Sequence, residues 1–209
     1  DDERPRHKVR LTRDFLIGKY QVTQALWDSV MGFNPSDFNG ANRPVECVSW
    51  FDCVLFCNKL SELEGLEPAY DGLGDYQVGA DQNIDEDEIE SLSDGITCNW
   101  TAKGYRLPTE AEWEYSARGG EYHQYSGSDN VDEVAWYYDN SDTGNGEQTH
   151  PVGQKKSNGF GLYDMSGNVE ELVWDWLSDD YSTEMSTSVS VENQLDSTEN
   201  NLDSVENPT

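Results

Sequence analysis

Acidic residues gather in three stretches of this 209-residue chain, and this uneven charge limits which segments can build a core. Residues 67–99 contain ten acidic and no basic residues, residues 121–176 contain eleven and two, and residues 177–209 contain eight and none. Seven Trp and eleven Tyr are present as well. Because aromatic side chains bury large apolar areas, a hydrophobic core is expected for part of the chain.

The formal net charge of −29 argues against several partners. Binding to nucleic acid needs a basic patch, and an anionic membrane surface is disfavoured for the same electrostatic reason. No run of 18 apolar residues is present, so no membrane-spanning segment is predicted. The chain begins with Asp1 rather than Met, so its first residues do not indicate a compartment, and cytoplasmic and exported locations both stay open. The oligomeric state is equally open.

The last acidic stretch differs in composition from the rest. It is rich in Ser, Thr, Asn, Asp and Glu, with one aromatic residue, Tyr181. Such a segment cannot bury enough apolar surface to offset the entropy of ordering it. Two domain ranges are therefore predicted: an ordered domain over residues 1–177 and a disordered acidic tail over residues 178–209.

The first acidic stretch is predicted to be a long loop over residues 71–95. Within it, acidic and amide side chains alternate as in an EF-hand, at Asp81, Asn83, Asp85 and Asp87. The EF-hand template needs Gly at its sixth position and Glu at its twelfth. Those positions hold Glu86 and Leu92 here. The pattern therefore favours a solvated acidic loop.

The remaining segments indicate an α+β fold with few helices, short strands and much ordered loop. Capping residues and apolar periodicity predict helices over residues 23–32, 49–64 and 109–119. Extended apolar segments predict strands over residues 15–20, 134–138 and 172–176.

Several strings of the chain are distinctive, and the most specific is Tyr105-Arg-Leu-Pro-Thr-Glu-Ala-Glu-Trp-Glu-Tyr115. The others are Phe15-Leu-Ile-Gly-Lys-Tyr-Gln-Val-Thr-Gln24, Asn34-Pro-Ser36, His150-Pro-Val-Gly153, Asn158-Gly-Phe-Gly-Leu-Tyr-Asp164 and Met165-Ser-Gly-Asn168. In content and order these strings resemble the formylglycine-generating-enzyme family, also called the sulfatase-modifying-factor family. The resemblance implies a fold similar to C-type lectins, in which irregular loops cover short, twisted antiparallel strands.

The resemblance stops near Trp176. The family continues with an Arg-Gly-Gly-Ser-Trp-like strand and a closing Gly-Phe-Arg strand, and neither is present here. In the oxidising members the catalytic cysteine pair lies in that region, so the domain is C-terminally incomplete and no catalytic residue is assigned. The four cysteines, none in a metal-type C-x-x-C spacing, are expected to be mainly small buried hydrophobic residues, so copper is not expected: Cys47, Cys53, Cys57 and Cys98.

Calcium is the cofactor that the resemblance implies. Ca²⁺ takes six to eight oxygen ligands, and one compact turn could supply several. The positions that match a family calcium site are Asp164, Gly167, Val169 and Glu171. The first and last would give side-chain oxygens, and the other two would give carbonyls. A second family site matches less clearly at Asn130, Val131, Asp139 and Asp142. The alternative is that all of these are capping and turn residues on an acidic surface.

Two functions from different classes follow. The first is a non-catalytic, calcium-stabilised binding or scaffold module. Its ligand could be a protein or peptide, and the aromatic run at residues 136–138, if it lines a groove, could contact a peptide or glycan. The alternative is a truncated fragment of an oxidoreductase that converts a cysteine of a target protein to formylglycine. The absent cysteine pair favours the first.

Overall fold

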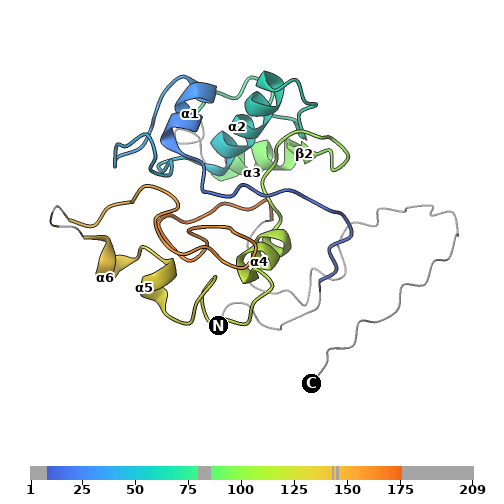
Figure 1. The fold of residues 1–209 in the computed structure, drawn as a ribbon. Helices are drawn as coiled ribbons and strands as arrows, with labels where there is room; N and C mark the ends of the chain where they lie inside the picture. Colours follow the sequence, from blue (N-terminus) through green and yellow to red (C-terminus); the bar gives the residue numbers. More distant parts are fainter. Residues whose placement is uncertain (1–8, 80–85, 143, 145, 176–209) are drawn as a thin grey trace, which may run out of the picture. The chain divides into compact units, whose positions relative to one another are not determined.

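A computed structural model describes residues 9–79, 86–142, 144 and 146–175 (Figure 1). These residues belong to one unit, Val9–Trp176. The second unit, Asp1–Lys8 with Leu177–Thr209, lies outside the described residues. The predicted tail over residues 178–209 and most of the EF-hand-like pattern also lie outside them.

The three helices predicted from capping signals are confirmed. Helix α1 spans Gln24–Met31 and is capped by Thr23, whose side chain accepts a hydrogen bond from the Leu26 amide. Helix α2 spans Trp50–Leu63, and helix α4 spans Glu110–Arg118. Both begin with a complete capping box, in which a Ser or Thr hydroxyl and an acidic side chain three residues later satisfy two otherwise unpaired amides.

The three predicted strands are wrong in the residues that the structure describes. Residues 15–20 form no strand, and Leu16 is fully exposed there. Residues 134–138 instead join two short helices, α5 at Val131–Val134 and α6 at Tyr138–Ser141. The Asn130 side chain accepts from an amide of the first turn of α5, and this cap favours helix over strand.

The segment at residues 172–175 is held by side-chain and single backbone contacts rather than by a strand ladder. Val173 O accepts a hydrogen bond from the Trp50 indole at 2.9 Å. Trp174 N donates to Pro108 O at 2.8 Å, and its ring stacks on Tyr70 with centroids 5.0 Å apart. Apolar content alone therefore misidentified this segment, because its aromatic residues pack individually.

The described part of the acidic stretch at residues 71–95 contains a helix where a loop is predicted. Strand β1, Tyr70–Asp71, pairs antiparallel with β2, Thr97–Cys98, and helix α3, Glu86–Gly95, lies between them in sequence. Ile89 and Leu92 are three residues apart and pack against the core, so α3 has an apolar side despite its charge. The prediction of a continuous solvated loop was therefore wrong for α3.

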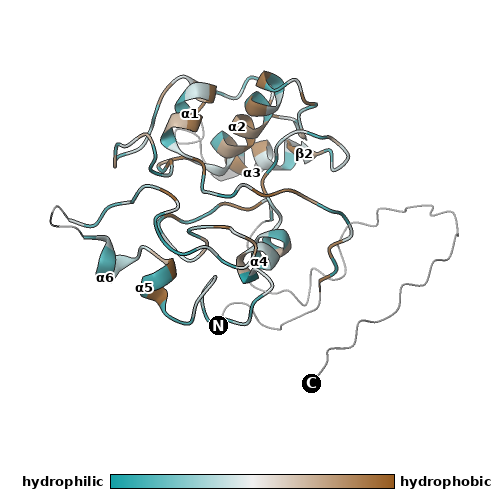
Figure 2. Ribbon diagram, in the orientation of Figure 1, coloured by the Kyte–Doolittle hydropathy of each residue, from teal (hydrophilic) through white to brown (hydrophobic). Residues whose placement is uncertain are grey.

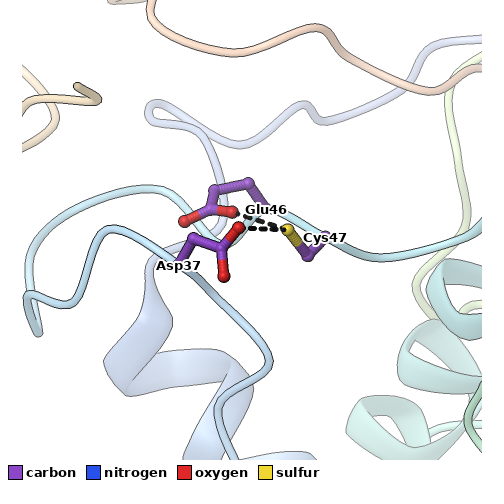
Figure 3. A group of neighbouring side chains, drawn as sticks. All are labelled: Asp37, Glu46 and Cys47. Atoms are coloured by element: carbon purple, nitrogen blue, oxygen red, sulfur yellow. Dashed lines mark hydrogen bonds between the residues drawn. The ribbon is translucent and has the colours of Figure 1, made fainter. Parts of the chain in front are cut away.

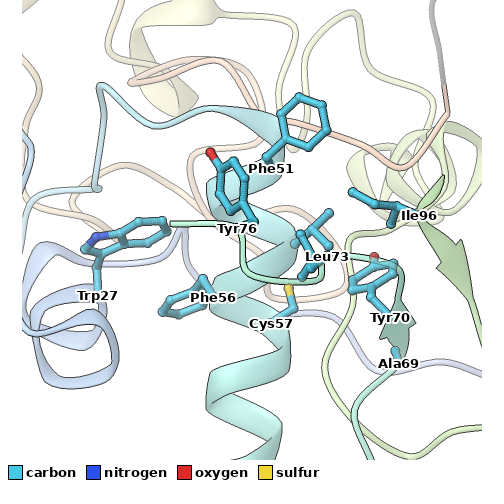
Figure 4. Close-up of a cluster of buried hydrophobic side chains, with 10 residues drawn as sticks. Trp27, Phe51, Phe56, Cys57, Ala69, Tyr70, Leu73, Tyr76 and Ile96 are labelled. Carbon is cyan, nitrogen blue, oxygen red and sulfur yellow. The ribbon is translucent and has the colours of Figure 1, made fainter. Parts of the chain in front are cut away.

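The core of the described unit surrounds α2 (Figure 4). Trp27 of α1 stacks on Phe56 of α2 with ring centroids 4.9 Å apart and an interplanar angle of 7°. Figure 2 shows both hydrophobic and hydrophilic residues along α1 and α2, as expected for helices that bury one side. The fully or nearly buried members of the cluster are Trp27, Phe51, Val54, Phe56, Cys57, Ala69, Tyr70, Leu73, Tyr76 and Ile96.

The described residues thus form an α+β fold with few helices and one small antiparallel sheet, as predicted. Loops connect most of the elements, and they carry the candidate site. Among the described residues, no helix combines the length and apolar character needed to cross a membrane.

Candidate metal centre

The loop at residues 164–171 has a tightly constrained backbone. Asp164 and Asn168 adopt positive φ angles of 61° and 74°. Short polar side chains tolerate this left-handed conformation better than most others. Gly167 is needed for a different reason, because a Cβ there would lie 2.3 Å from the carbonyl oxygen of Trp136. The Asn168 side chain accepts from His150 N at 2.8 Å and donates to His150 O at 3.0 Å, which fixes the turn.

Four oxygen atoms of this loop converge on the side-chain nitrogen of Gln21. Nε2 of Gln21 lies 2.8 Å from Glu171 Oε1 and 3.1 Å from the carbonyl oxygen of Gly167. It lies 3.3 Å from Val169 O and 3.4 Å from Asp164 O. We call these four oxygens the oxygen cradle. The structure therefore brings together all four residues of the first predicted calcium site, with Gln21 added from the N-terminal segment.

The Asp164 side chain is arranged differently from the prediction. Its Oδ2 accepts a hydrogen bond from Gly153 N at 2.7 Å, and the residue contributes its carbonyl oxygen to the cradle. Its Oδ1 is buried and has no hydrogen-bond partner among the described residues. Burial raises the pKa of the Asp164 carboxyl, since the charged form loses solvation.

Glu171 is held from two sides. Its Oε1 accepts from Gln21, and its Oε2 accepts from the Trp113 indole Nε1 at 2.6 Å. Burial raises the pKa of Glu171, and the nearby Asp164 charge acts in the same direction, while the two hydrogen bonds oppose them. In the part of the chain that the structure describes, neither carboxylate forms a salt bridge with a basic side chain.

A surface pocket of about 460 Å³ opens beside the cradle. It is lined by residues of α4 and of the loop that follows Leu162, namely Trp113, Asp164, Met165, Ser166, Gly167, Val169, Glu170, Glu171 and Val173. Water could therefore reach the cradle and complete a ligand set, because Ca²⁺ commonly keeps water among its six to eight oxygens.

The second predicted set has capping and turn roles in the structure. Asn130 caps α5, which begins at Val131. Oδ1 of Asp142 accepts from the amides of Gly144 and Gly146 at 2.6 and 3.0 Å. Asp139 lies in the first turn of α6. These contacts match the alternative considered from the sequence.

All four cysteines are free thiols. Cys53 and Cys57 both lie on α2; Cys57 is buried and Cys53 is half-buried. Burial raises the pKa of Cys53 to about 12, and that of Cys57 still further. Burial also raises the pKa of Cys98 to about 11. The expectation of a buried residue is therefore confirmed for Cys57, while Cys53 and Cys98 are half-buried, and burial raises the pKa of all three thiols.

Cys47 departs from that expectation, because it is exposed and adopts a φ of 59°. Its Sγ donates to Glu46 Oε2 at 3.0 Å and to Asp37 Oδ2 at 3.7 Å (Figure 3). The hydrogen bond to Glu46 is the main reason that the Cys47 pKa rises to about 11. The sequence showed only that Glu46 and Cys47 are adjacent, and it gave no reason to place Asp37 beside them.

Comparison with known proteins identifies the family and relatives of the chain. The family model described as "Sulfatase-modifying factor enzyme 1-like domain" matches residues 1–196. "Chaperone protein LppX" of Paenibacillus barcinonensis is 47% identical over 193 residues, which is 85% of this chain and 68% of that protein. The formylglycine-generating enzyme of Mycobacterium tuberculosis is 41% identical over 88 residues, or 37% of this chain and 28% of that enzyme.

Two solved structures share the fold. Treponema denticola variable protein 1 matches with a TM-score of 0.65 and 39% identity, covering 78% of this chain and 64% of that one. A crystal structure of CarF matches with a TM-score of 0.57 and 33% identity, covering 75% of this chain and 67% of that one. The fold and the loop motifs thus define a protein with a formylglycine-generating-enzyme-like fold. The chain belongs to the sulfatase-modifying-factor family, and it spans about two thirds of LppX and under a third of the mycobacterial enzyme.

Proposed function

We propose that this chain is a non-catalytic, calcium-stabilised module of the sulfatase-modifying-factor family that binds another polypeptide. The observation that carries the proposal is the oxygen cradle. Three carbonyl oxygens and one carboxylate oxygen meet at one point beside a pocket. Oxygen donors of this mixed kind are what Ca²⁺ prefers.

The residues present fit a divalent cation. Asp164 and Glu171 are two carboxylates with raised pKa values, and one oxygen of Asp164 is buried without a partner. Asp164, Gly167, Val169 and Glu171 would hold the ion. Bound calcium would neutralise the two carboxylates and cross-link the ends of the loop. Its role would be structural, because the site exists only in the folded chain, so the free energy of calcium binding adds to the stability of the fold.

The thiols support a non-catalytic role. A copper site of the family type needs two thiolates held close together, because soft thiolate ligands select Cu(I). The raised pKa values of Cys53, Cys57 and Cys98 oppose thiolate formation at neutral pH. Cys47 is exposed but lies between two carboxylates that repel a thiolate.

Binding of a polypeptide is supported by the relative with the longest match described above. LppX is named a chaperone protein, and the similarity extends over 193 residues. The alternative is a fragment of a formylglycine-generating oxidoreductase, and it is favoured by the 88-residue similarity to the mycobacterial enzyme. The two functions predict different products when the chain meets a cysteine-containing peptide.

The experiment that separates them uses two assays on the same preparation. In the first assay, the copper-loaded chain is incubated in air with a peptide that carries a sulfatase-type cysteine motif. The mass of the peptide is then measured by mass spectrometry. We expect the cysteine mass to persist, and conversion to the aldehyde above a no-protein control would overturn the non-catalytic proposal. In the second, light scattering follows the aggregation of reduced insulin, an acidic client to which a chain of net charge −29 has no general electrostatic attraction. We expect calcium-dependent suppression, and aggregation unchanged by the chain would contradict a chaperone-like role.

A further inference from the structure

We propose that the Gln21 side-chain amide occupies the cation position of the oxygen cradle in the metal-free chain, so that calcium must displace it to bind. The inference rests on the proposed calcium site and assigns Gln21 a regulatory role in it. Gln21 is 143 to 150 residues away in sequence from the loop residues that it contacts. No motif placed it near the site.

The number of acceptors around Nε2 is the first argument. An amide NH₂ group has two hydrogens, and each is best directed at one acceptor. Here four oxygens lie within 3.4 Å of Nε2. At most two of them can receive a well-directed hydrogen bond at once, and the shortest contacts are those to Glu171 and Gly167. Several oxygens that converge on one point are typical of a cation site rather than of an amide site.

The other end of the same amide gives the second argument. Oε1 of Gln21 is buried and has no hydrogen-bond partner among the described residues. A buried acceptor is normally paired. The side chain therefore keeps Nε2 in the cradle although Oε1 receives no hydrogen bond there. Turning the amide over would place that oxygen against four others, which is repulsive unless a cation lies between them.

The backbone around Gln21 holds the amide in place. Tyr163 N donates to Lys19 O at 3.2 Å, and the rings of Tyr20 and Tyr163 lie 5.2 Å apart. These contacts attach residues 19–21 to the segment that leads into the cradle loop. Gln21 is therefore presented to the cradle at high local concentration, and it competes with free calcium as a tethered ligand does.

Charge determines which competitor prevails. The amide is neutral, so it hydrogen-bonds to the cradle but leaves the Asp164 and Glu171 carboxylates uncompensated. Calcium supplies the missing charge but must first remove the amide. One consequence is that the loop stays ordered without metal. The other is that the apparent calcium affinity equals the affinity of the open cradle multiplied by the fraction of chains in which the amide has left it.

The test compares calcium binding by isothermal titration for the wild-type chain, Gln21→Ala and the matched control Gln124→Ala, whose side chain is exposed. We expect Gln21→Ala to bind calcium about tenfold more tightly, equal to about 1.4 kcal/mol, and to melt at a lower temperature than wild type when metal-free. Gln124→Ala should match wild type in both respects. Should Gln21→Ala fail to fold without metal, Gln21→Met keeps the side-chain length, cannot donate to the cradle and adds no charged ligand, so it should also bind calcium more tightly.

Each other outcome is decisive. Weaker binding by Gln21→Ala would make Gln21 a ligand and overturn the competition. Equal binding by Gln21→Ala and wild type would also reject the role of Gln21, while leaving the proposed calcium site intact. No calcium binding by the wild-type chain or by either Gln21 variant would reject both the inference and the calcium part of the proposed function.

Discussion

Trp113 Nε1 donates a hydrogen bond to Glu171 Oε2 over 2.6 Å, and this contact joins α4 to the oxygen cradle. The helix itself is well fixed, because Thr109 and Glu112 form its capping box. Both terminal nitrogens of Arg106 also reach the Glu112 carboxylate, at 2.6 and 2.7 Å. A rigid helix therefore orients the one side-chain oxygen donor of the cradle.

Replacing Trp113 with Phe should weaken calcium binding without unfolding the chain. An aromatic ring stays at this position, but the indole N–H that orients Glu171 is lost. Changes to such supporting hydrogen bonds typically reduce metal affinity by about 10- to 100-fold. Titration calorimetry of W113F would measure the loss. The matched control is Trp100→Phe, because Trp100 lies outside the residues that line the pocket. Equal affinity for W113F and wild type would show that the indole does not orient the ligand.

The calcium effect should shrink as the pH falls. Burial raises the pKa values of Asp164 and Glu171 in the metal-free folded chain above the ordinary carboxyl value of about 4. Protonation of these groups therefore stabilises the metal-free fold at low pH, and that contribution is lost as the pH rises through the raised values. Calcium needs the ionised forms, so the two effects oppose each other.

Melting temperatures with and without calcium, measured on demetallated protein from pH 7.5 to pH 5, test this linkage. The difference between the two curves should narrow steadily toward pH 5. A calcium shift that stays constant over this range would mean that neither carboxylate takes part.

Removing one charge beside Cys47 should make its thiol more reactive. The Glu46 hydrogen bond is the largest cause of the raised Cys47 pKa of about 11, and the Glu46 charge adds to it. In Glu46→Gln the pKa should fall, and each unit of decrease gives tenfold more thiolate at a fixed pH below the pKa. Iodoacetamide alkylation at pH 8, followed by peptide mass spectrometry, would report the rate. Alkylation no faster in E46Q than in wild type would contradict the assigned cause.

Loss of the α2 cap should destabilise the core. The Ser49 hydroxyl accepts from Asp52 N at 3.2 Å, and the Asp52 side chain accepts from Ser49 N at 3.2 Å. Ser49→Ala should lower the free energy of unfolding by about 1 kcal/mol in denaturant titrations. The matched control is Ser29→Ala, because the exposed Ser29 hydroxyl donates only to Leu26 O within α1. An equal decrease in the free energy of unfolding for the two variants would show that the Ser49 cap does not stabilise the fold more than an exposed serine hydroxyl does.

Local signals in the sequence predicted the helices well. The Thr109–Glu112 and Ser49–Asp52 boxes are contained within four residues each, so their structure depends little on the rest of the chain. No local signal could test the strand predicted at residues 15–20. A strand needs a pairing partner, and none of the apolar residues in this segment specifies one. Helix α3 was missed because its charge concealed the spacing of Ile89 and Leu92.

The residues of the site also differ in whether a local sequence motif could predict them. Its loop residues lie within eight positions of one another, so a family motif could place them together. Gln21 approaches from the opposite end of the domain sequence, and only the folded chain shows its contact with the cradle. The sequence therefore could not show that the Gln21 amide lies at the position where a cation would bind.

The most direct test of the central claim is the melting temperature of the demetallated chain as CaCl₂ is added at constant ionic strength, for wild type and Glu171→Gln. At about 100 times the dissociation constant, binding should stabilise the wild-type fold by about 2.7 kcal/mol. The melting temperature should rise with calcium for wild type, and much less for E171Q or with magnesium, which demands stricter octahedral geometry. Superimposable wild-type curves with and without calcium, or an E171Q shift equal to that of wild type, would contradict calcium binding in the oxygen cradle.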